Sequence, residues 1–570
     1  MNYDIEFSEV KFKYEGSETW ALQDINLCVE PGEIVLITGP AGSGKTTLCN
    51  CIIGLIPHYH TGQLEGRVLV RGYDTKKARI GGLASLVGLV SQDPESQLVT
   101  ASVSDEVAFG PENLGVPRDE INRRVSESLR VTRLLGYEDR LPHSLSGGEQ
   151  QACVISAIYA MDPEIYVMDE PLANLDPVGR AQVLKVMVEV AKQRGKTLVL
   201  VEHALEEVLP LVDRVVILNK GQIVRDGTAA EVLAKGDLPK VFTRPAIIRL
   251  AERFNIDPIP LSPDRFYQKL TSKYRIKEIK QMKTVPPDPP AGEPVIEFQE
   301  VSFSYNEQSP ALNNVNLSIY QGELVAILGR NGSGKTTLVR HIIGLLQPDR
   351  GRVVVLGKDV SATPTHELAR YVGFCFQNPN HQIVSFTVRD EMAFGLKAHN
   401  VPAEQFETLI QESLEFVDML DYLDAEVFDL GKGQKQRLAL ASVLTLKPKI
   451  LIIDEPTTGQ DPRMADEIFE IIKRLNDSGT TVILITHKID YAAMFASRAI
   501  VLQRGRIAYD GPVLELIANL QLMRENSLDI PDTTKLAMQL SKHGAPPWLV
   551  KFEDLEAVIQ EMVGENNGSN

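Results

Sequence analysis

Two short stretches of the sequence decide the fold: "GPAGSGKTT" at 39–47 and "GRNGSGKTT" at 329–337. Each follows an apolar run typical of a buried strand, "IVLIT" at 34–38 or "LVAIL" at 324–328, and each leads into a helical pattern. A strand, a glycine-rich loop and a helix in this order form the context that a phosphate-binding loop requires. Because the same context occurs twice, a glycine-rich turn without a nucleotide is a poor alternative.

The residues of each loop have predictable roles toward a bound nucleotide. Glycines let backbone amides close around phosphate oxygens, and the N-terminus of the following helix favours the anion. We expect Lys45 and Lys335 to reach the β and γ phosphates, and Thr46 and Thr336 to hold Mg²⁺. The predicted nucleotide-binding residues of the two loops are Gly39, Pro40, Ala41, Gly42, Ser43, Gly44, Lys45, Thr46, Thr47, Gly329, Arg330, Asn331, Gly332, Ser333, Gly334, Lys335, Thr336 and Thr337.

The sequence repeats itself along its length. The two glycine-rich loops lie 290 positions apart (329 − 39), whereas "VMDEP" and "IIDEP" lie 285 apart (454 − 169), because one loop of the first half is longer. The segments from 244 and from 530 also share apolar positions at helical spacing. Such self-similarity indicates a duplicated structural unit. We therefore expect two copies of one α/β unit, each with a small helical appendage.

A second apolar strand ends in two acidic residues in each half, "IYVMDE" at 165–170 and "ILIIDE" at 450–455. In a parallel sheet, these carboxylates lie beside the phosphate-binding loop. The first acid, Asp169 or Asp454, is predicted to hold Mg²⁺ through water. The second, Glu170 or Glu455, is predicted to orient and polarise the water that attacks the γ phosphate.

A third strand ends in histidine in each half, "TLVLVEH" and "TVILITH". His203 and His487 are therefore expected at the carboxyl edge of the sheet, where a side chain can contact the γ phosphate. A single histidine at such a place is more often structural. Its occurrence at the same strand end in both halves favours the functional interpretation.

Composition and charge limit the possible functions. The chain has 570 residues, of which 43% are apolar and 24% charged, as in ordinary globular proteins of several domains. A net charge of −17 disfavours a nucleic-acid partner, although a local basic patch can hide in an acidic total. Five scattered cysteines suit reduced thiols. No stretch approaches the roughly 20 apolar residues that span a bilayer, so we expect any membrane role to come through a partner.

Together these motifs resemble one family, the ATPase subunits of ABC transporters, over essentially the whole chain. "LSGGEQ" at 145–150 is similar to the signature sequence of that family, and "LGKGQK" at 430–435 is an altered second copy. "ANLD" at 173–176 and "TGQD" at 458–461 are similar to its D-loops. The resemblance implies an ATPase that uses ATP and Mg²⁺.

The resemblance also implies the fold and its boundaries. We expect an α/β protein with two tandem P-loop NTPase (ABC ATPase) domains. Each would have a mostly parallel sheet, an antiparallel β subdomain, a helical signature subdomain and a small C-terminal helical appendage. The expected boundaries are ATPase domain 1 at 1–236, a helical appendage and linker at 237–284, a proline-rich spacer at 285–294, ATPase domain 2 at 295–520, a C-terminal helical appendage at 521–563 and a disordered tail at 564–570.

Further site residues follow from the motifs of the family. Tyr14 and Tyr305 sit where the family stacks an aromatic ring on adenine, with ordinary strand packing as the alternative. The resemblance implies catalytic roles for Gln92, Gln377, Glu170, Glu455, His203 and His487. It implies Mg²⁺ ligands at Thr46, Gln92, Asp169, Thr336, Gln377 and Asp454. It implies signature contacts to the nucleotide from Ser146, Gly147, Gly148, Gly431, Lys432 and Gly433.

A narrower resemblance concerns the segments at 91–117 and 376–402, which are similar to the Q-loop region of energy-coupling-factor importers. In that group, two ATPase domains drive a transmembrane coupling protein and a small substrate-capture membrane protein, and they import vitamins, vitamin precursors or transition-metal ions. The resemblance implies these membrane partners and a place at the cytoplasmic face of the cell membrane. The transported substrate cannot be read from ATPase residues.

Soluble tandem ATPases of the same superfamily are the alternative. One type acts on ribosomes and carries a long basic helical linker, whereas the linker of this chain is proline-punctuated and the chain is acidic. Another type acts in DNA repair and needs long coiled-coil heptads, which this sequence lacks. The importer interpretation is therefore favoured.

The two ATP sites are expected to differ. The family pairs its two ATPase domains head to tail, so that each ATP lies between one phosphate loop and the other signature, and fusion would make this pairing intramolecular. The altered signature "LGKGQKQR" at 430–437 would then face Lys45, whereas Ser146 and the glycines after it would face Lys335. We therefore expect slower hydrolysis at the Lys45 site.

Overall fold

The computed structural model describes residues 3–173, 175–234, 238, 244–280, 292–305, 310–457, 460 and 462–566. The chain divides into two compact units, unit 1 at residues 1–273 and unit 2 at residues 274–570. Most of the predicted proline-rich spacer and the last residues of the predicted tail lie outside the described residues, as do D-loop residues Asn174, Thr458, Gly459 and Asp461.

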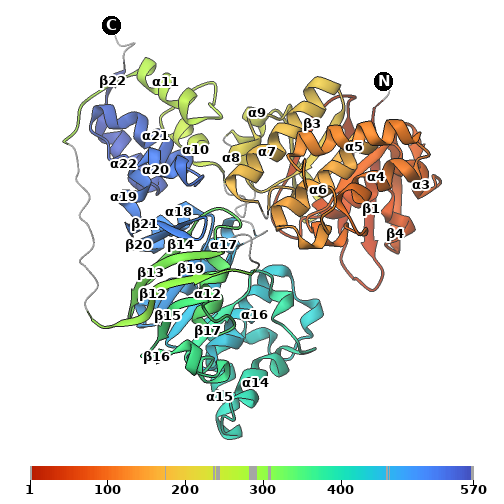
Figure 1. Cartoon of the computed structure of the whole chain (residues 1–570). Helices are drawn as coiled ribbons and strands as arrows, with labels where there is room; N and C mark the ends of the chain where they lie inside the picture. Colours follow the sequence, from red (N-terminus) through yellow and green to blue (C-terminus); the bar gives the residue numbers. More distant parts are fainter. Residues whose placement is uncertain are drawn as a thin grey trace. The chain divides into compact units, whose positions relative to one another are not determined.

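Each unit is built on a six-stranded sheet whose strands are parallel except for one edge strand (Figure 1). The strand order in unit 1 is β10-β9-β3-β8-β7-β6, and that in unit 2 is β21-β20-β14-β19-β18-β17. In unit 1 the strands are β3 (Ile34–Thr38), β6 (Val87–Val90), β7 (Ile165–Asp169), β8 (Thr197–Val201), β9 (Arg214–Asn219) and β10 (Gln222–Gly227). In unit 2 they are β14 (Leu324–Leu328), β17 (Val372–Cys375), β18 (Ile450–Asp454), β19 (Thr481–Ile485), β20 (Arg498–Gln503) and β21 (Arg506–Pro512).

A four-stranded antiparallel sheet accompanies each six-stranded sheet. Its strands in unit 1 are β1 (Ile5–Tyr14), β2 (Leu22–Val29), β4 (Gly62–Val70) and β5 (Tyr73–Asp74). Its strands in unit 2 are β12 (Pro294–Phe303), β13 (Leu312–Tyr320), β15 (Arg350–Val355) and β16 (Lys358–Asp359). The expected α/β architecture, a mostly parallel sheet with an antiparallel sheet and helices in each of two tandem domains, is confirmed.

The central strand of each unit is buried on both faces, which explains its unbroken apolar sequence. Along β3, Ile34 and Leu36 face the core under the helices, whereas Val35 and Ile37 face the core under the antiparallel sheet. The same alternation recurs along β14. Because these apolar faces hold the strand from both sides, the loop that follows it starts from a rigid position.

Helices cover the sheets and form the remaining layers. In unit 1 they are α1 (Lys45–Ile52), α2 (Leu55–His58), α3 (Ile80–Ala84), α4 (Val103–Asn113), α5 (Arg118–Thr132), α6 (Gly147–Met161), α7 (Pro177–Val188), α8 (Leu205–Val208), α9 (Ala229–Leu233), α10 (Ala246–Arg253) and α11 (Pro263–Lys273). In unit 2 they are α12 (Lys335–Ile342), α13 (Thr365–Leu368), α14 (Val388–Ala398), α15 (Phe406–Phe416), α16 (Lys432–Leu444), α17 (Pro462–Asp477), α18 (Ile489–Phe495), α19 (Val513–Ala518), α20 (Leu520–Glu525), α21 (Asp532–Leu540) and α22 (Phe552–Met562). Within the described ranges, no helix combines the length and the apolar character needed to cross a bilayer.

Unit 1 has one residue more between β7 and β8 than unit 2 has between β18 and β19. Asp169 and His203 are 34 positions apart (203 − 169), whereas Asp454 and His487 are 33 apart (487 − 454). The turn at Glu189–Gln193, directly after α7, is π-helical. A π turn accommodates one additional residue in a helix, so this turn explains the difference.

The first three residues of the predicted disordered tail, 564–566, belong to a strand, and the other four lie outside the described residues. Val563–Asn566 form strand β22, which pairs in antiparallel fashion with β11 (Tyr274–Ile276). The backbone N–H of Lys277 also donates to the carbonyl of Met562 at 2.8 Å. Residues 274–277, which the sequence assigned to the first appendage, therefore contact the second through backbone hydrogen bonds.

Candidate functional site

The phosphate-binding loops require glycine because the chain passes close to a neighbouring strand. Gly39 has φ +147, and a Cβ atom there would lie 2.0 Å from the carbonyl oxygen of Leu218 at the end of β9. Gly329 has φ +139, and its Cβ would lie 2.3 Å from the carbonyl oxygen of Leu502. Any side chain would push the loop away from the sheet edge, so the first glycine of each motif sets the shape of the loop.

The lysine of each loop is buried and held by the loop itself. Nζ of Lys45 donates to the carbonyl oxygens of Gly39 and Pro40, both at 3.0 Å. Nζ of Lys335 donates in the same way to Gly329 at 2.7 Å and to Arg330 at 2.9 Å. Both ammonium groups therefore lie on the inner side of their loops, where phosphate oxygens would enter.

The hydroxyl groups of the loops fit a phosphate. Oγ of Ser43 and Oγ of Ser333 are buried and have no hydrogen-bond partner within the part of the chain that the structure describes. A buried hydroxyl without a partner is costly, and a phosphate oxygen in the loop would satisfy it. This observation and the positions of the lysines support the predicted nucleotide site.

The aspartate that ends β7 or β18 lies next to a threonine of the phosphate-binding loop in the same unit. Thr46 lies beside Asp169 and Thr336 beside Asp454, close enough for each hydroxyl to lower the pKa of its carboxyl group. Burial raises the pKa of Asp169, and it raises the pKa of Asp454 to about 6. Oδ1 of Asp169 is buried without a hydrogen-bond partner among the described residues. A divalent cation held by these oxygen ligands would favour the ionised carboxylates, so the residues present fit Mg²⁺.

The second acidic residue contacts the histidine that ends the next strand. Nε2 of His203 lies 3.2 Å from Oε1 of Glu170, and Nε2 of His487 lies 3.3 Å from Oε1 of Glu455. Both glutamates have left-handed backbone conformations, with φ 49° and 45°, and each N–H donates to the strand of its histidine. Burial raises the pKa of Glu455, the charge of Lys335 opposes part of this rise, and the charge of Asp454 adds to it.

The two units hold their glutamate and histidine differently. In unit 1, Nε2 of Gln92 donates to Oε2 of Glu170 at 2.7 Å. The corresponding Gln377 is exposed, and its side chain makes no hydrogen bond within the described residues. In unit 2, Nε2 of His487 instead lies 3.0 Å from Oδ1 of Asn331, where the loop of unit 1 has Ala41.

The tyrosines predicted to stack on adenine contact the helix that follows the phosphate-binding loop. The hydroxyl of Tyr14 lies 3.1 Å from Oγ1 of Thr47, and that of Tyr305 lies 3.4 Å from Oγ1 of Thr337. Tyr305 is 53% exposed, which leaves its ring accessible. Both tyrosines therefore lie within reach of a nucleotide in the loop, and adenine stacking stays a prediction.

The signature sequences start the two helices α6 and α16. In unit 1, Ser146 and Glu149 form a capping box, in which the serine hydroxyl donates to the carboxylate at 2.8 Å. In unit 2, the N–H of Gly431 donates to Oε1 of Gln434 at 2.9 Å, but glycine offers no hydroxyl at this position. Gly147, Gly148, Lys432 and Gly433 follow in the first turns of these helices.

Several site residues were not predicted from the sequence. Glu202 is buried before His203, and its Oε1 accepts the N–H of Leu172 at 2.9 Å, but the other half has Thr486 there, so repetition gave no signal. Glu106 and Glu391 are buried and accept backbone N–H groups at the end of the Q-loop. Their occurrence in both halves within "SDEVAFG" and "RDEMAFG" was a usable signal.

Comparison with known proteins identifies the class. The protein-family profile described as ABC transporter matches residues 22–173 and 312–458, once in each unit. The chain therefore belongs to the ABC transporter family, and it carries two ATPase domains in tandem.

Relatives of similar length support this membership. A protein of Caldanaerobacter subterraneus with a provisional name as an ABC transporter ATP-binding protein is 38% identical over 95% of this chain and 96% of the relative. A similarly named protein of Methanosarcina acetivorans is 37% identical over 98% of this chain and 94% of the relative.

Among solved structures, cbiO1 from Clostridium perfringens, part of the ABC transporter complex cbiONQ, matches with 31% identity and TM-score 0.39 over 42% of this chain and 97% of that chain.

Glu202→Gln should remove a pH dependence from the stability of unit 1. Burial raises the pKa of Glu202 to about 8 from the ordinary value of 4.5, so the folded chain binds this proton more tightly than the unfolded chain. Wild-type stability should then fall as pH rises from about 4.5 to 8, by on the order of 2 kcal/mol or more from this group alone. The thermal midpoint of the variant should exceed that of the wild type at pH 8.5 by more than at pH 6. The exposed Glu18→Gln is the control, and an equal pH response of both variants would contradict the assignment.

Asn331→Ala should slow ATP turnover without weakening ATP binding. The lost hydrogen bond holds His487 and is worth about 1 kcal/mol, so kcat should fall about fivefold at an unchanged KM for ATP. Steady-state kinetics measure both constants. Asn380→Ala is the matched control, because this exposed side chain makes no hydrogen bond within the described residues. A raised KM with kcat unchanged would show that Asn331 serves binding instead.

Proposed function

We propose that this ABC ATPase energises an energy-coupling-factor type importer at the cytoplasmic face of the cell membrane. The partners would be a transmembrane coupling protein and a substrate-capture membrane protein, and the cargo would be a vitamin, a vitamin precursor or a transition-metal ion. The observation that carries the proposal is a set of exposed apolar side chains beside the Q-loop, present at matching positions of both units.

The first members of this set follow the Q-loop directly. Val99 is 64% exposed and Val384 is 63% exposed, although the backbone around each is fixed by buried Glu106 or Glu391. Phe109 on α4 and Phe394 on α14 are also exposed. Apolar side chains that stay exposed on a rigid backbone, twice at the same place, are typical of a docking surface for another protein.

Unit 2 presents a more aromatic version of this surface. Phe386 and Phe428 are 74% and 72% exposed, and their ring centroids lie 6.1 Å apart. Their counterparts in unit 1 are Ala101 and His143. We infer that the two units contact segments of the membrane partner that are not identical, and that unit 2 takes the bulkier apolar one.

Gln92 would connect this surface to the nucleotide. Its side chain holds Glu170, and its backbone begins the loop that ends at Val99. Bound Mg²⁺ would neutralise charge on the β and γ phosphates. The residues of the chain would then divide the work: Lys45 and Lys335 hold the phosphates, Glu170 and Glu455 orient the attacking water, and the glutamines transmit the change to the partner.

Head-to-tail pairing of the two units would complete each ATP site with the signature of the other unit. The Lys335 site would receive Ser146, whereas the Lys45 site would receive Gly431 and Lys432, with no hydroxyl at the signature position. Removing one aligned donor from a developing negative charge lowers the rate by on the order of 10²–10³. We therefore assign most ATP turnover to the Lys335 site.

The soluble alternative, a tandem ATPase acting on ribosomes, has less support. The similar proteins of matching length carry transporter names. The residues that the structure describes show no feature that favours a ribosomal partner.

Cysteine crosslinking should test the membrane partner. Glu95 and Asn380 are exposed in the two Q-loops, and cysteines placed there, in a chain freed of native cysteines, should trap a helical membrane protein in membranes that contain the permease partners. Tyr59→Cys is the control, because this residue is 74% exposed and distant in sequence from both Q-loops. Adding Phe386→Ser and Phe428→Ser should reduce the yield at Asn380 more than at Glu95. Capture of soluble proteins alone, or equal capture from the Tyr59 position, would contradict the proposal.

Glutamine substitutions should reveal the unequal sites. Glu455→Gln should remove most steady-state ATP turnover, because it disables the site with the intact signature, whereas Glu170→Gln should leave a substantial fraction. Glu404→Gln, an exposed carboxylate in unit 2, controls for the charge change. Equal losses in the two site variants would overturn the assignment of turnover to the Lys335 site.

A further inference from the structure

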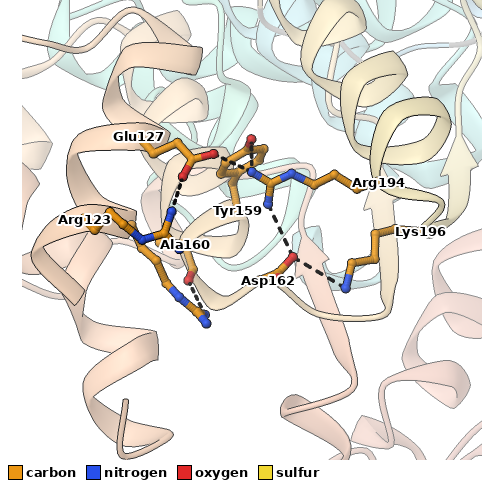
Figure 2. Close-up of a pocket in the computed structure, with 8 residues that line it drawn as sticks. Arg123, Glu127, Tyr159, Ala160, Asp162, Arg194 and Lys196 are labelled. Atoms are coloured by element: carbon orange, nitrogen blue, oxygen red, sulfur yellow. Dashed lines mark hydrogen bonds and ion pairs between the residues drawn. The ribbon is translucent and has the colours of Figure 1, made fainter. Parts of the chain in front are cut away.

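Unit 1 has two hollows outside the ATP site, and neighbouring stretches of the sequence line them. One, of about 370 Å³, is lined by residues of α5, the end of α6 and the segment 194–196 (Figure 2). The other, of about 280 Å³, is lined by the end of α5, by α7 and by the first residue of the π turn. Both hollows contain several cations, although the chain has a net charge of −17. Whether acidic side chains of the protein pair with these cations decides whether a hollow can bind an anion.

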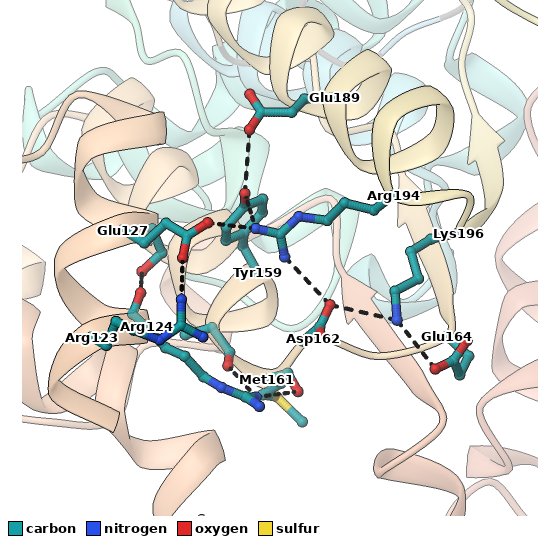
Figure 3. A network of polar contacts seen from close by, with 12 residues as sticks. Arg123, Arg124, Glu127, Tyr159, Met161, Asp162, Glu164, Glu189, Arg194 and Lys196 are labelled. Carbon is teal, nitrogen blue, oxygen red and sulfur yellow. Dashed lines mark hydrogen bonds and ion pairs between the residues drawn. The ribbon is translucent and has the colours of Figure 1, made fainter. Parts of the chain in front are cut away.

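The cations of the larger hollow are neutralised by the protein itself (Figure 3). Arg194 pairs with Glu127 at 2.7 Å and with Asp162 at 3.4 Å, and its guanidinium lies over the ring of Tyr159. Lys196 pairs with Asp162 at 3.5 Å. Arg123 and Arg124 both form ion pairs with Glu120, at 2.7 and 2.8 Å. This network ties α5 to the segment 194–196 before β8, and it leaves little reason for a ligand.

The cations of the smaller hollow have no such partners. Arg130, Arg133 and Lys185 line it, and none of the three makes a side-chain hydrogen bond or ion pair within the described residues. The one carboxylate of the lining, Glu189, is bound instead by the hydroxyl of Tyr159 at 3.4 Å (Figure 3). Three cations gathered around a single carboxylate leave an excess of positive charge in the hollow, so this arrangement favours an anion.

A hydrogen bond that involves none of the three cations links the two helices that line the hollow. Nε2 of Gln182 on α7 donates to the carbonyl oxygen of Val131 on α5, which fixes the two helices relative to each other. Arg133 caps α5 in a left-handed conformation with φ 64°. The three cations therefore come from α5, its C-cap and α7, and the link between the two helices does not use their charges.

The second half of the chain reverses these charges. At an offset of 285 positions, the counterparts are Glu415 for Arg130, Asp418 for Arg133, Glu470 for Lys185 and Arg474 for Glu189. In unit 2 one of these acids meets cations of the protein: Asp418 lies 4.0 Å from Arg474 and 3.9 Å from Arg437. The fold thus tolerates either sign at this place, so the basic set of unit 1 is not a requirement of the fold.

We propose that the hollow formed by Arg130, Arg133, Lys185 and Gln182 binds a phosphate or diphosphate group. Two guanidinium groups and one ammonium suit the oxygens of a multiply charged phosphate, because arginine binds them in bidentate fashion and lysine as a point charge. A volume of about 280 Å³ admits a phosphate-sized anion. The group can come from a soluble phosphate compound or from an anionic lipid headgroup, and both present the same chemistry.

Calorimetric titration of the full chain with inorganic pyrophosphate tests the site. The titration uses the Lys45→Ala, Lys335→Ala double variant, which lacks the phosphate-binding lysines of the ATP sites. If that variant does not fold, the wild-type chain saturated with a non-hydrolysable ATP analogue takes its place. One pyrophosphate should bind per chain in either background. Arg130→Glu, Arg133→Glu and Lys185→Glu together, which copy the signs of unit 2, should weaken binding at least thirtyfold.

A matched variant separates the site from net charge. Lys77→Glu, Arg79→Glu and Arg118→Glu change the charge equally at exposed positions outside the hollow and should leave pyrophosphate affinity unchanged. Sedimentation with phosphatidylglycerol vesicles identifies the source: binding that pyrophosphate competes away indicates a lipid headgroup, and no binding to vesicles indicates a soluble phosphate. Absence of both pyrophosphate and vesicle binding would overturn the proposal, as would equal weakening by the two triple variants.

Discussion

The close passage of each phosphate-binding loop over the neighbouring strand is the constraint on which the rest of each unit depends. Gly39 can lie against the carbonyl of Leu218 only because β9 is hydrogen-bonded beside β3, and Gly329 depends on β20 in the same way. This contact turns the loop so that its lysine bonds back to the loop carbonyls. The strand order then brings β7 and β18, with their acidic ends, to the threonine of the loop. An apolar core on each face of the sheet keeps these strand ends in place.

Much of this arrangement could be predicted from the sequence because its signals are local and occur twice. The apolar strand runs, the glycines and the strand-ending acids each follow from a backbone requirement that few residue types meet. The chain has the predicted pair of α/β units, and Asp169 does meet Thr46. The role of each residue toward ATP stays a prediction that the experiments above address.

What the sequence did not predict depends on contacts between distant segments. The pairing of Tyr274–Ile276 with Val563–Asn566 joins residues 287 and 292 positions apart (563 − 276 and 566 − 274), and the tail sequence "GENNGSN" has a composition typical of disorder. Buried Glu202 has no counterpart in the other half, and its role as an acceptor for the N–H of Leu172 is visible only in three dimensions. The contact between Asn331 and His487 likewise joins the phosphate-binding loop to a residue 156 positions away, just after β19.

The two units share a common core but differ in the residues that hold the glutamate and histidine of the ATP site and in the signature sequence. Unit 1 holds its glutamate with Gln92, whereas unit 2 holds its histidine with Asn331, and the serine of one signature is glycine in the other. The central claim is that both loops are nevertheless nucleotide sites. Equilibrium binding of Mg²⁺-ATP to the whole chain tests it most directly. We predict two ATP per chain, one after either Lys45→Ala or Lys335→Ala, and none in the double variant; undiminished binding by the double variant would contradict the account.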